Sequence, residues 1–191
     1  MIHLGDLVLL SFNSDLMEED RKIKIFDNKV SFKTRQEIYN SAHNSFYKLG
    51  WEDAVQKESE PNLFSEWSIE DLSKENILPC IEDCIEETLW FQNKHLENII
   101  INLVKSEDVH YIHAHWDKQI ALYYVNLDWK DGWYGETLFY DPLNLQKIDF
   151  ASSFIPGRIL LFDGSIPHTI RPQSIKGPKF RMTLSLIYSK R

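Results

Sequence analysis

The feature that most constrains the fold of this 191-residue chain is a change of hydrophobic period after residue 97. From there on, apolar residues recur with a period of two in short runs rich in β-branched and aromatic residues, which is typical of strands. Turn sequences such as KDGW, DPLN, IPG and KGPK separate the runs. The predicted strands are ENIIINLV, VHYIHAH, QIALYYVNL, ETLFYD, RILLFDG, HTIRP and RMTLSLIYS. Short strands without helical patterns between them predict an antiparallel sandwich or jelly-roll barrel.

The first half of the chain has helical patterns instead. Residues 33–50 carry apolar residues at helical spacing and end at Gly50, which is suited to a helix C-cap. A second helix is predicted from about residue 78 to 94. We therefore expect a single domain of the α+β class with a mainly β core. Its jelly roll, a double-stranded β-helix of cupin-like form, occupies residues 96–191 and is braced by helices within residues 1–95.

Composition limits the partners and the compartment. The net charge of −8 argues against binding to nucleic acid, which needs a basic face for the phosphates. Cys80 and Cys84 lie four residues apart in the second predicted helix, where a metal pair, a disulfide or two free thiols would fit. The absence of companion ligands in the sequence favours free thiols and a reducing compartment. Residues 3–12 are a predicted strand without the basic region of a signal peptide, and no stretch has the ~20 apolar residues of a membrane span. We expect a cytoplasmic protein.

The pentapeptide HAHWD at 113–117 concentrates candidate metal ligands. On a strand, His115 and Asp117 project to one face, and a jelly roll can bring the later strand that begins at His168 beside them. Two histidines and one carboxylate form the ligand set of non-haem Fe(II) oxygenases. A strand-end histidine hydrogen-bonded to a neighbouring carboxylate explains these residues equally well, so both interpretations stay open. His113 shares the face of His115, but it lacks a carboxylate two residues onward, so we favour it as pocket wall.

Arg181 lies in a strand that is otherwise apolar and that contains no acidic residue. An unpaired buried charge is costly, so a ligand that bears a carboxylate is a good partner for its bidentate guanidinium. Thr183 and Ser185 follow at intervals of two, so they share its face and offer hydroxyl groups to that carboxylate. In ALYYVNL, Tyr123 and Tyr124 project to opposite faces, so one of the two tyrosines points inward.

Residues 98–188 resemble the Fe(II)- and 2-oxoglutarate-dependent dioxygenases, in particular their prolyl-4-hydroxylase-like branch. The matching motifs follow the family's order: HWD, ALYYVNLDW, WYGETLFYD, PGRILLFDG, PHTIRP and FRMTLSLIY. The resemblance implies a catalytic iron site and a 2-oxoglutarate site on this chain. The implied iron ligands are His115, Asp117 and His168. The residues implied to bind 2-oxoglutarate are Arg181, Tyr124 and Ser185.

Two departures from the family affect this assignment. The loop QSIKGPK before Arg181 is longer than is usual in the branch, which keeps Arg171 as an alternative partner of the 2-oxoglutarate carboxylate. Tyr134 stands where the family commonly has the first of two glycines, so the entry to that strand can differ.

The resemblance implies an oxygenase that uses Fe(II), 2-oxoglutarate and O2, with ascorbate as a supporting reductant. It hydroxylates an unactivated C–H bond, such as that of a prolyl residue in a peptide or protein, and releases succinate and CO2. The alternatives are the same chemistry on a free amino acid or another small molecule, a cupin-like metal-binding isomerase, and a non-catalytic module. Buried Arg181 argues against the isomerase, and the intact ligand set argues against the non-catalytic module. The sequence does not predict the oligomeric state.

The acidic segment 51–78 has two interpretations. Its aromatic residues Trp51, Phe64 and Trp67 can form part of a lid over the substrate, or they can be ordinary core residues. The sequence favours neither.

Overall fold

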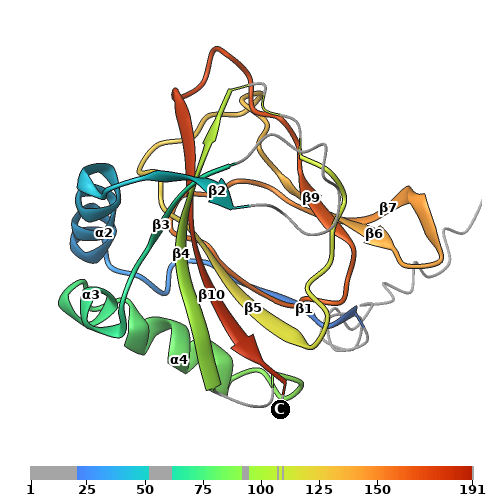
Figure 1. The fold of residues 1–191 in the computed structure, drawn as a ribbon, viewed down its shortest axis with the longest axis horizontal. Coiled ribbons are helices and arrows are strands. Elements are labelled where there is room, and N and C mark those ends of the chain that lie inside the picture. Colours follow the sequence, from blue (N-terminus) through green and yellow to red (C-terminus); the bar gives the residue numbers. More distant parts are fainter. Residues whose placement is uncertain (1–20, 52–61, 92–94, 107, 109, 191) are drawn as a thin grey trace, which may run out of the picture.

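The computed structural model describes residues 21–51, 62–91, 95–106, 108 and 110–190. The strands are β1 (Ile23–Phe26), β2 (Lys48–Trp51), β3 (Asn62–Glu66), β4 (His95–Lys105), β5 (Lys118–Tyr124), β6 (Thr137–Asp141), β7 (Asn144–Ser152), β8 (Ile159–Asp163), β9 (His168–Ile170) and β10 (Phe180–Ser189). They form two antiparallel sheets (Figure 1). The larger sheet has the order β1-β8-β5-β10-β4-β3-β2, and the smaller one has the order β7-β6-β9.

The helices are α2 (Phe32–Asn44), α3 (Ile69–Lys74) and α4 (Leu78–Glu86). They lie on one side of the large sheet, and the small sheet lies on the other (Figure 1). Successive side chains of the central strands point to opposite faces of the large sheet, and this alternation produces the layers. On β4, Ile101 packs in the cluster that contains Ile38 and Ile81 of the helices, whereas its neighbour Ile100 packs in the cluster that contains Phe139 of the small sheet. The mainly β fold class predicted from the sequence is confirmed.

The first predicted helix is shorter than expected, and the role predicted for Gly50 is wrong. The helix ends at Asn44, and the backbone N–H of Ser45 donates a hydrogen bond to the carbonyl of Ala42. Beyond it the chain becomes extended as β2, where Gly50 has a φ of 131° beside a register shift in the pairing with β3. Phe46 is 89% exposed, so its helical spacing does not reflect a buried face.

The second predicted helix also ends early. Glu87 caps α4 by donating its backbone N–H to the carbonyls of Asp83 and Ile85, and Thr88 Oγ1 donates to the carbonyl of Cys84 at 2.8 Å. Cys84 and Cys80 are free thiols. Residues 92–94 and the predicted strand at 3–12 lie outside the described residues. No helix in the described part of the chain is long and apolar enough to cross a membrane.

The strand predictions differ from the structure in two ways. The described residues 110–115 of VHYIHAH do not form a regular strand, and among them only His113 forms a bridge, to His168. Strand β7 was not predicted, because it is an edge strand with nearly every residue exposed, so its sequence lacks alternation. Strands β1, β2 and β3 were also not predicted, and they extend the large sheet at both edges.

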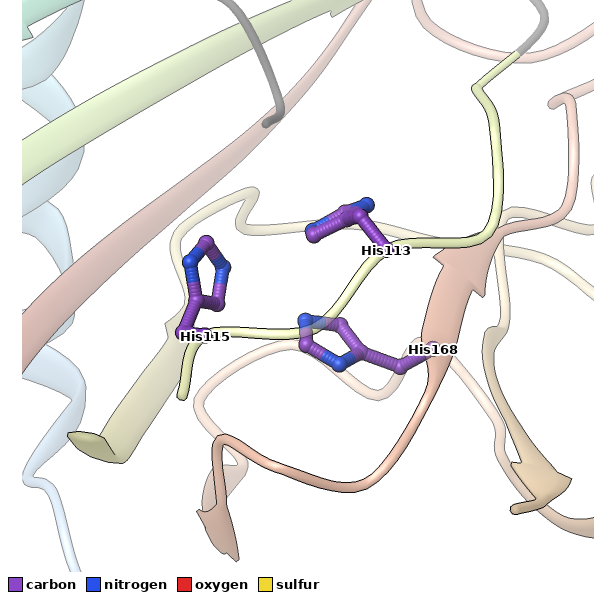
Figure 2. A group of neighbouring side chains, drawn as sticks. All are labelled: His113, His115 and His168. Atoms are coloured by element: carbon purple, nitrogen blue, oxygen red, sulfur yellow. The ribbon is translucent and has the colours of Figure 1, made fainter. Parts of the chain in front are cut away.

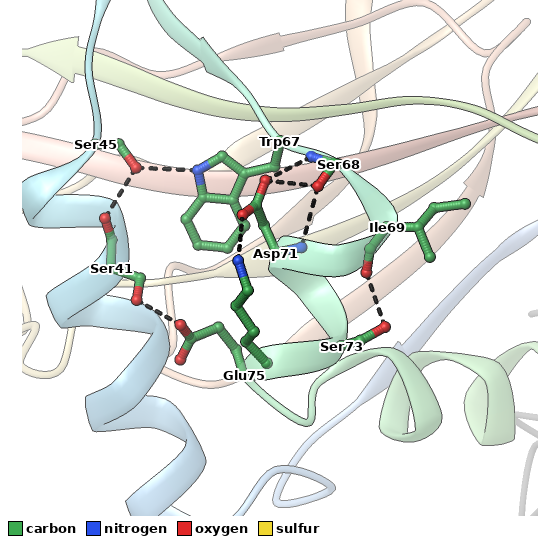
Figure 3. Close-up of polar contacts among 9 residues, drawn as sticks. Ser41, Ser45, Trp67, Ser68, Ile69, Asp71, Ser73 and Glu75 are labelled. Atoms are coloured by element: carbon green, nitrogen blue, oxygen red, sulfur yellow. Dashed lines mark hydrogen bonds and ion pairs between the residues drawn. The ribbon is translucent and has the colours of Figure 1, made fainter.

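The described part of segment 51–78 contributes β3 to the large sheet and then continues into α3. Phe64 is buried, and the indole N–H of Trp67 donates a hydrogen bond to Ser45 Oγ at 3.0 Å (Figure 3). Ser68 then begins α3 with a capping box to Asp71. Phe64 and Trp67 are therefore core-packed residues. The side chain of Trp51 and residues 52–61 lie outside the described residues.

Candidate metal centre

A cavity lies between the two sheets and carries the candidate site. Its walls are mostly apolar, with residues such as Ile100, Leu122 and Phe162, and its polar groups gather in two places. One place has the histidines of the HAHWD segment together with His168, and the other has Arg181 of β10. Among the described residues that line the cavity there is no aspartate or glutamate.

Backbone pairing brings three histidines together. The N–H of His113 donates to the carbonyl of His168 at 3.0 Å, and the N–H of His168 donates back to the carbonyl of His113 at 2.9 Å. Two residues on, the N–H of His115 donates to the carbonyl of Gly164 at 2.7 Å. One ligand atom of each histidine lies within 4.8 Å of those of the other two, and the three side chains share one space (Figure 2).

Two of the three imidazoles are oriented by backbone carbonyls. His168 Nδ1 lies 2.7 Å from the carbonyl oxygen of Ile166, and His113 Nδ1 lies 3.1 Å from that of Tyr111. A carbonyl oxygen only accepts, so the proton of the neutral ring is on Nδ1 and the lone pair is on Nε2. This is the usual arrangement for histidines that bind a metal, because the carbonyl fixes both the tautomer and the ring orientation.

Asp117 does not belong to this histidine group. The extended segment ends at His115, and the chain then turns through Trp116 and Asp117, which has a φ of 61°. The prediction that His115 and Asp117 share a face assumed a strand through both residues, and the turn removes that relation. The side chain of Asp117 is exposed, and its carbonyl accepts a hydrogen bond from the N–H of Lys190 at 3.0 Å.

Arg181 is almost fully buried, with 1% of its surface exposed. Its Nε donates to the carbonyl of Gly135 at 2.9 Å, and one terminal nitrogen donates to Thr137 Oγ1 at 3.2 Å. The guanidinium lies 5.4 Å and 5.0 Å from the ring centres of Tyr124 and Phe154. Burial lowers the pKa of Arg181 to about 10, so the group stays protonated at neutral pH. Within the described residues it forms no salt bridge with a carboxylate, so an anionic ligand would compensate its charge.

The other predicted cofactor residues take different positions. Thr183 and Ser185 line the cavity on the same strand as Arg181. Tyr124 is the inward tyrosine of its pair, but it does not line the cavity and shares a hydrogen bond of 2.8 Å with Thr137 Oγ1. Tyr123 is buried on the helix side of the sheet.

Arg171 lies elsewhere and does not line the cavity. Its guanidinium is 3.5 Å from Glu136 Oε1 and stacks 3.7 Å above the ring centre of Tyr134. Tyr134 has a φ of 60°, a conformation that glycine adopts without strain. Of the two arginines, Arg181 is the one that faces the cavity.

Sequence reasoning did not assign Asn102 or Thr137 to the cavity. Asn102 lines it and donates a hydrogen bond to Ser185 Oγ at 3.1 Å. A polar residue between Ile100 and Val104 on the inner face of one strand was the signal that could have identified Asn102. Thr137 carried no comparable signal, because a threonine is common in any strand.

No protein-family model matches the chain, and no curated protein matches it in sequence at a significant level. Solved structures do match, and the fold they share with this chain is the jelly roll of the 2-oxoglutarate- and Fe(II)-dependent oxygenases. A prolyl hydroxylase from Trichoplax adhaerens, solved with a peptide of hypoxia inducible factor, has a TM-score of 0.72 at 16% identity, covering 92% of this chain and 86% of its own.

Two further structures have the same fold. A prolyl-4-hydroxylase from Pseudomonas putida has a TM-score of 0.69 at 11% identity, covering 90% of this chain and 95% of its own. HygX from Streptomyces hygroscopicus, solved with nickel and 2-oxoglutarate, has a TM-score of 0.67 at 9% identity, covering 94% and 87%. At these identities the likeness establishes the fold, and the predicted double-stranded β-helix is confirmed.

Proposed function

We propose that this protein is an Fe(II)- and 2-oxoglutarate-dependent oxygenase that hydroxylates a C–H bond and releases succinate and CO2. One observation carries the proposal: a single cavity is lined by three histidines whose ligand atoms could hold a metal ion and by buried Arg181, which forms no salt bridge with a carboxylate of the described residues. A metal ion and a dicarboxylate are the two ligands that such an arrangement would bind. The shared fold supports the same reading.

The histidine group fits a divalent metal by its donor atoms and their spacing. His115 and His168 are two ligands in this proposal, with a third from the same segment. When bound, iron with 2-oxoglutarate and O2 supplies the oxidising power that inserts oxygen into a C–H bond, while 2-oxoglutarate is converted to succinate and CO2.

The remaining residues would bind and position the co-substrate. Arg181 pairs with the distal carboxylate of 2-oxoglutarate, and Thr183 and Ser185 offer hydroxyl groups to the same carboxylate. Thr137 accepts a hydrogen bond from Arg181 and is itself bonded to Tyr124, so these two residues hold the guanidinium in place. The apolar walls exclude water, which strengthens each of these polar interactions.

The proposed substrate is a peptide, with a prolyl residue as the first candidate, and a small molecule is the alternative. Structures with the same fold include one solved with a peptide of hypoxia inducible factor and one solved with hygromycin B. The acidic chain favours a neutral or cationic substrate over nucleic acid. Free Cys80 and Cys84 support a reducing, cytoplasmic location.

The test is turnover of 2-oxoglutarate without added substrate. We expect the purified protein with Fe(II), ascorbate and O2 to form succinate slowly. His168→Ala should abolish this reaction, and Arg181→Gln should raise the 2-oxoglutarate concentration at half-maximal rate at least tenfold. His43→Ala is the matched control, because His43 is an exposed histidine of α2 that stacks on Tyr39.

Thermal unfolding checks that each variant is folded. No succinate from the wild-type protein, together with no stabilisation by Ni(II) and 2-oxoglutarate, would contradict the proposal. If the wild-type protein does form succinate, a mass-spectrometric screen for a +16 Da product over peptide and amino-acid pools would identify the substrate class.

A further inference from the structure

We infer that the metal centre is held by three histidines, His113, His115 and His168, and that this neutral ligand set makes the centre bind a monovalent anion. The ligand set follows from the geometry alone. The anion follows from the charges in the cavity. It rests on the proposed function, because the charge balance includes bound 2-oxoglutarate.

Backbone pairing places His113 among the ligands. His113 and His168 exchange both backbone hydrogen bonds, so they are directly opposite residues of an antiparallel pair with side chains on one face. His115 is two residues further along the same extended segment and returns to that face. The ring centre of His113 lies 4.4 Å from that of His168 and 5.0 Å from that of His115, and the ring centres of His115 and His168 are 5.3 Å apart.

The spacing of the donor atoms suits one ion. Metal–nitrogen bonds of about 2.0–2.1 Å place two ligands at right angles roughly 2.9 Å apart. The histidine donor atoms are within 4.8 Å of one another, so a bound ion would draw the three rings closer together. His113 and His168 are already oriented by the carbonyls of Tyr111 and Ile166.

Asp117 is held away from the three histidines by the strand pairing next to its turn. Strand β5 begins at Lys118, which pairs with Ser189 of β10. Beside that pair, the N–H of Lys190 donates to the carbonyl of Asp117. A ligand role for Asp117 would require the turn with its φ of 61° to open, whereas His113 needs no change of backbone.

The ligand set decides the charge of the loaded cavity. A divalent metal and the dianion of 2-oxoglutarate compensate each other, and Arg181 then adds one positive charge. A carboxylate ligand would cancel that charge, but three neutral imidazoles do not. The carboxylate of Glu136 interacts electrostatically with Arg181, but Glu136 does not line the cavity and also pairs with Arg171 at 3.5 Å. Because the described lining has no acidic residue, an uncompensated charge in this apolar cavity attracts one monovalent anion to the metal centre.

Titration of the metal-free protein with Co(II), followed by calorimetry and visible absorption, tests the ligand set without any co-substrate. We expect His113→Ala to lower Co(II) affinity at least 100-fold, and Asp117→Asn and His43→Ala to leave it within twofold of the wild type. Thermal unfolding of the metal-free variants separates loss of a ligand from loss of the fold, and His113→Gln provides a second variant of similar size. Loss of Co(II) affinity in Asp117→Asn with retention in His113→Ala would overturn the assignment.

Azide titration of the protein loaded with Co(II) and 2-oxoglutarate tests the anion. We expect azide to shift the visible bands of the wild type. His113→Asp, which restores one negative charge at the metal, should retain Co(II) and bind azide at least tenfold more weakly. Equal azide binding by the two proteins, or none by the wild type, would overturn the inference about the anion. Absence of succinate formation with intact three-histidine Co(II) binding would contradict the oxygenase proposal alone.

Discussion

Gly164 provides the sharpest test of how the metal centre is built, because the backbone of His115 approaches it closely. The N–H of His115 donates to the carbonyl of Gly164 at 2.7 Å, and the N–H of Gly164 donates to the carbonyl of Lys118 at 2.9 Å. A Cβ added at Gly164 would lie 2.7 Å from the His115 carbonyl oxygen and 2.9 Å from that of Lys118. Both obstacles are backbone atoms, so no side-chain rotation relieves them.

The size of the disturbance follows from these distances. Ordinary contacts of a Cβ begin at 3.4 Å, so Gly164→Ala has to increase the separation of the Gly164 and His115 backbones by about 0.7 Å (3.4 − 2.7). Overpacking of this kind costs about 1–3 kcal/mol of stability. Metal–ligand distances tolerate only about 0.2 Å. We therefore expect Co(II) affinity to fall roughly 10- to 100-fold, as it does when a residue that supports a ligand is changed, and Tm to fall by about 2–12 °C.

Calorimetric titration with Co(II) and thermal unfolding with and without Co(II) measure both effects. Gly177→Ala is the matched control, because its Cβ would come no nearer than 3.2 Å to Trp133 and 3.3 Å to the carbonyl oxygen of Ser174, and because neither of these residues lines the cavity. A folded Gly164→Ala protein with wild-type Co(II) affinity and wild-type Tm would refute the reasoning.

Three further predictions concern other parts of the protein. Thr137→Val removes the hydroxyl that binds both Arg181 and Tyr124, so steady-state kinetics should show the 2-oxoglutarate KM raised by roughly 5- to 100-fold with the protein still folded. Ile101→Ala leaves a cavity at a fully buried position and should lower the free energy of unfolding in urea by about 2–5 kcal/mol. Burial alone would raise the pKa of Asp163, but hydrogen bonds from Lys190 and Ser165 outweigh it and lower the pKa. The stability that this carboxylate contributes is therefore present above its unfolded pKa of about 3.9 and is lost as pH falls through the lower folded value. Acid titration of Asp163→Asn should show a flatter loss of stability in that range, and an unchanged profile would contradict the assignment.

The sequence alone was sufficient for the fold class and for one part of the site. Period-two alternation determined the central strands, because each has one face toward the helices and one toward the cavity. Arg181 was identifiable for a related reason: a charged residue in an apolar strand needs an anionic partner, whatever the details of the fold. Alternation also placed Thr183 and Ser185 beside it on the cavity wall.

Only the tertiary structure decided which residues meet in the histidine group. Alternation predicts a shared face for His115 and Asp117 only while the strand continues, and the chain turns after His115 because β5 begins at Lys118 and is fixed by its pairing with β8 and β10. Long-range backbone pairing likewise decides which residue lies opposite His168, and that residue is His113. Both facts depend on hydrogen bonds between segments far apart in the sequence, which no local pattern encodes.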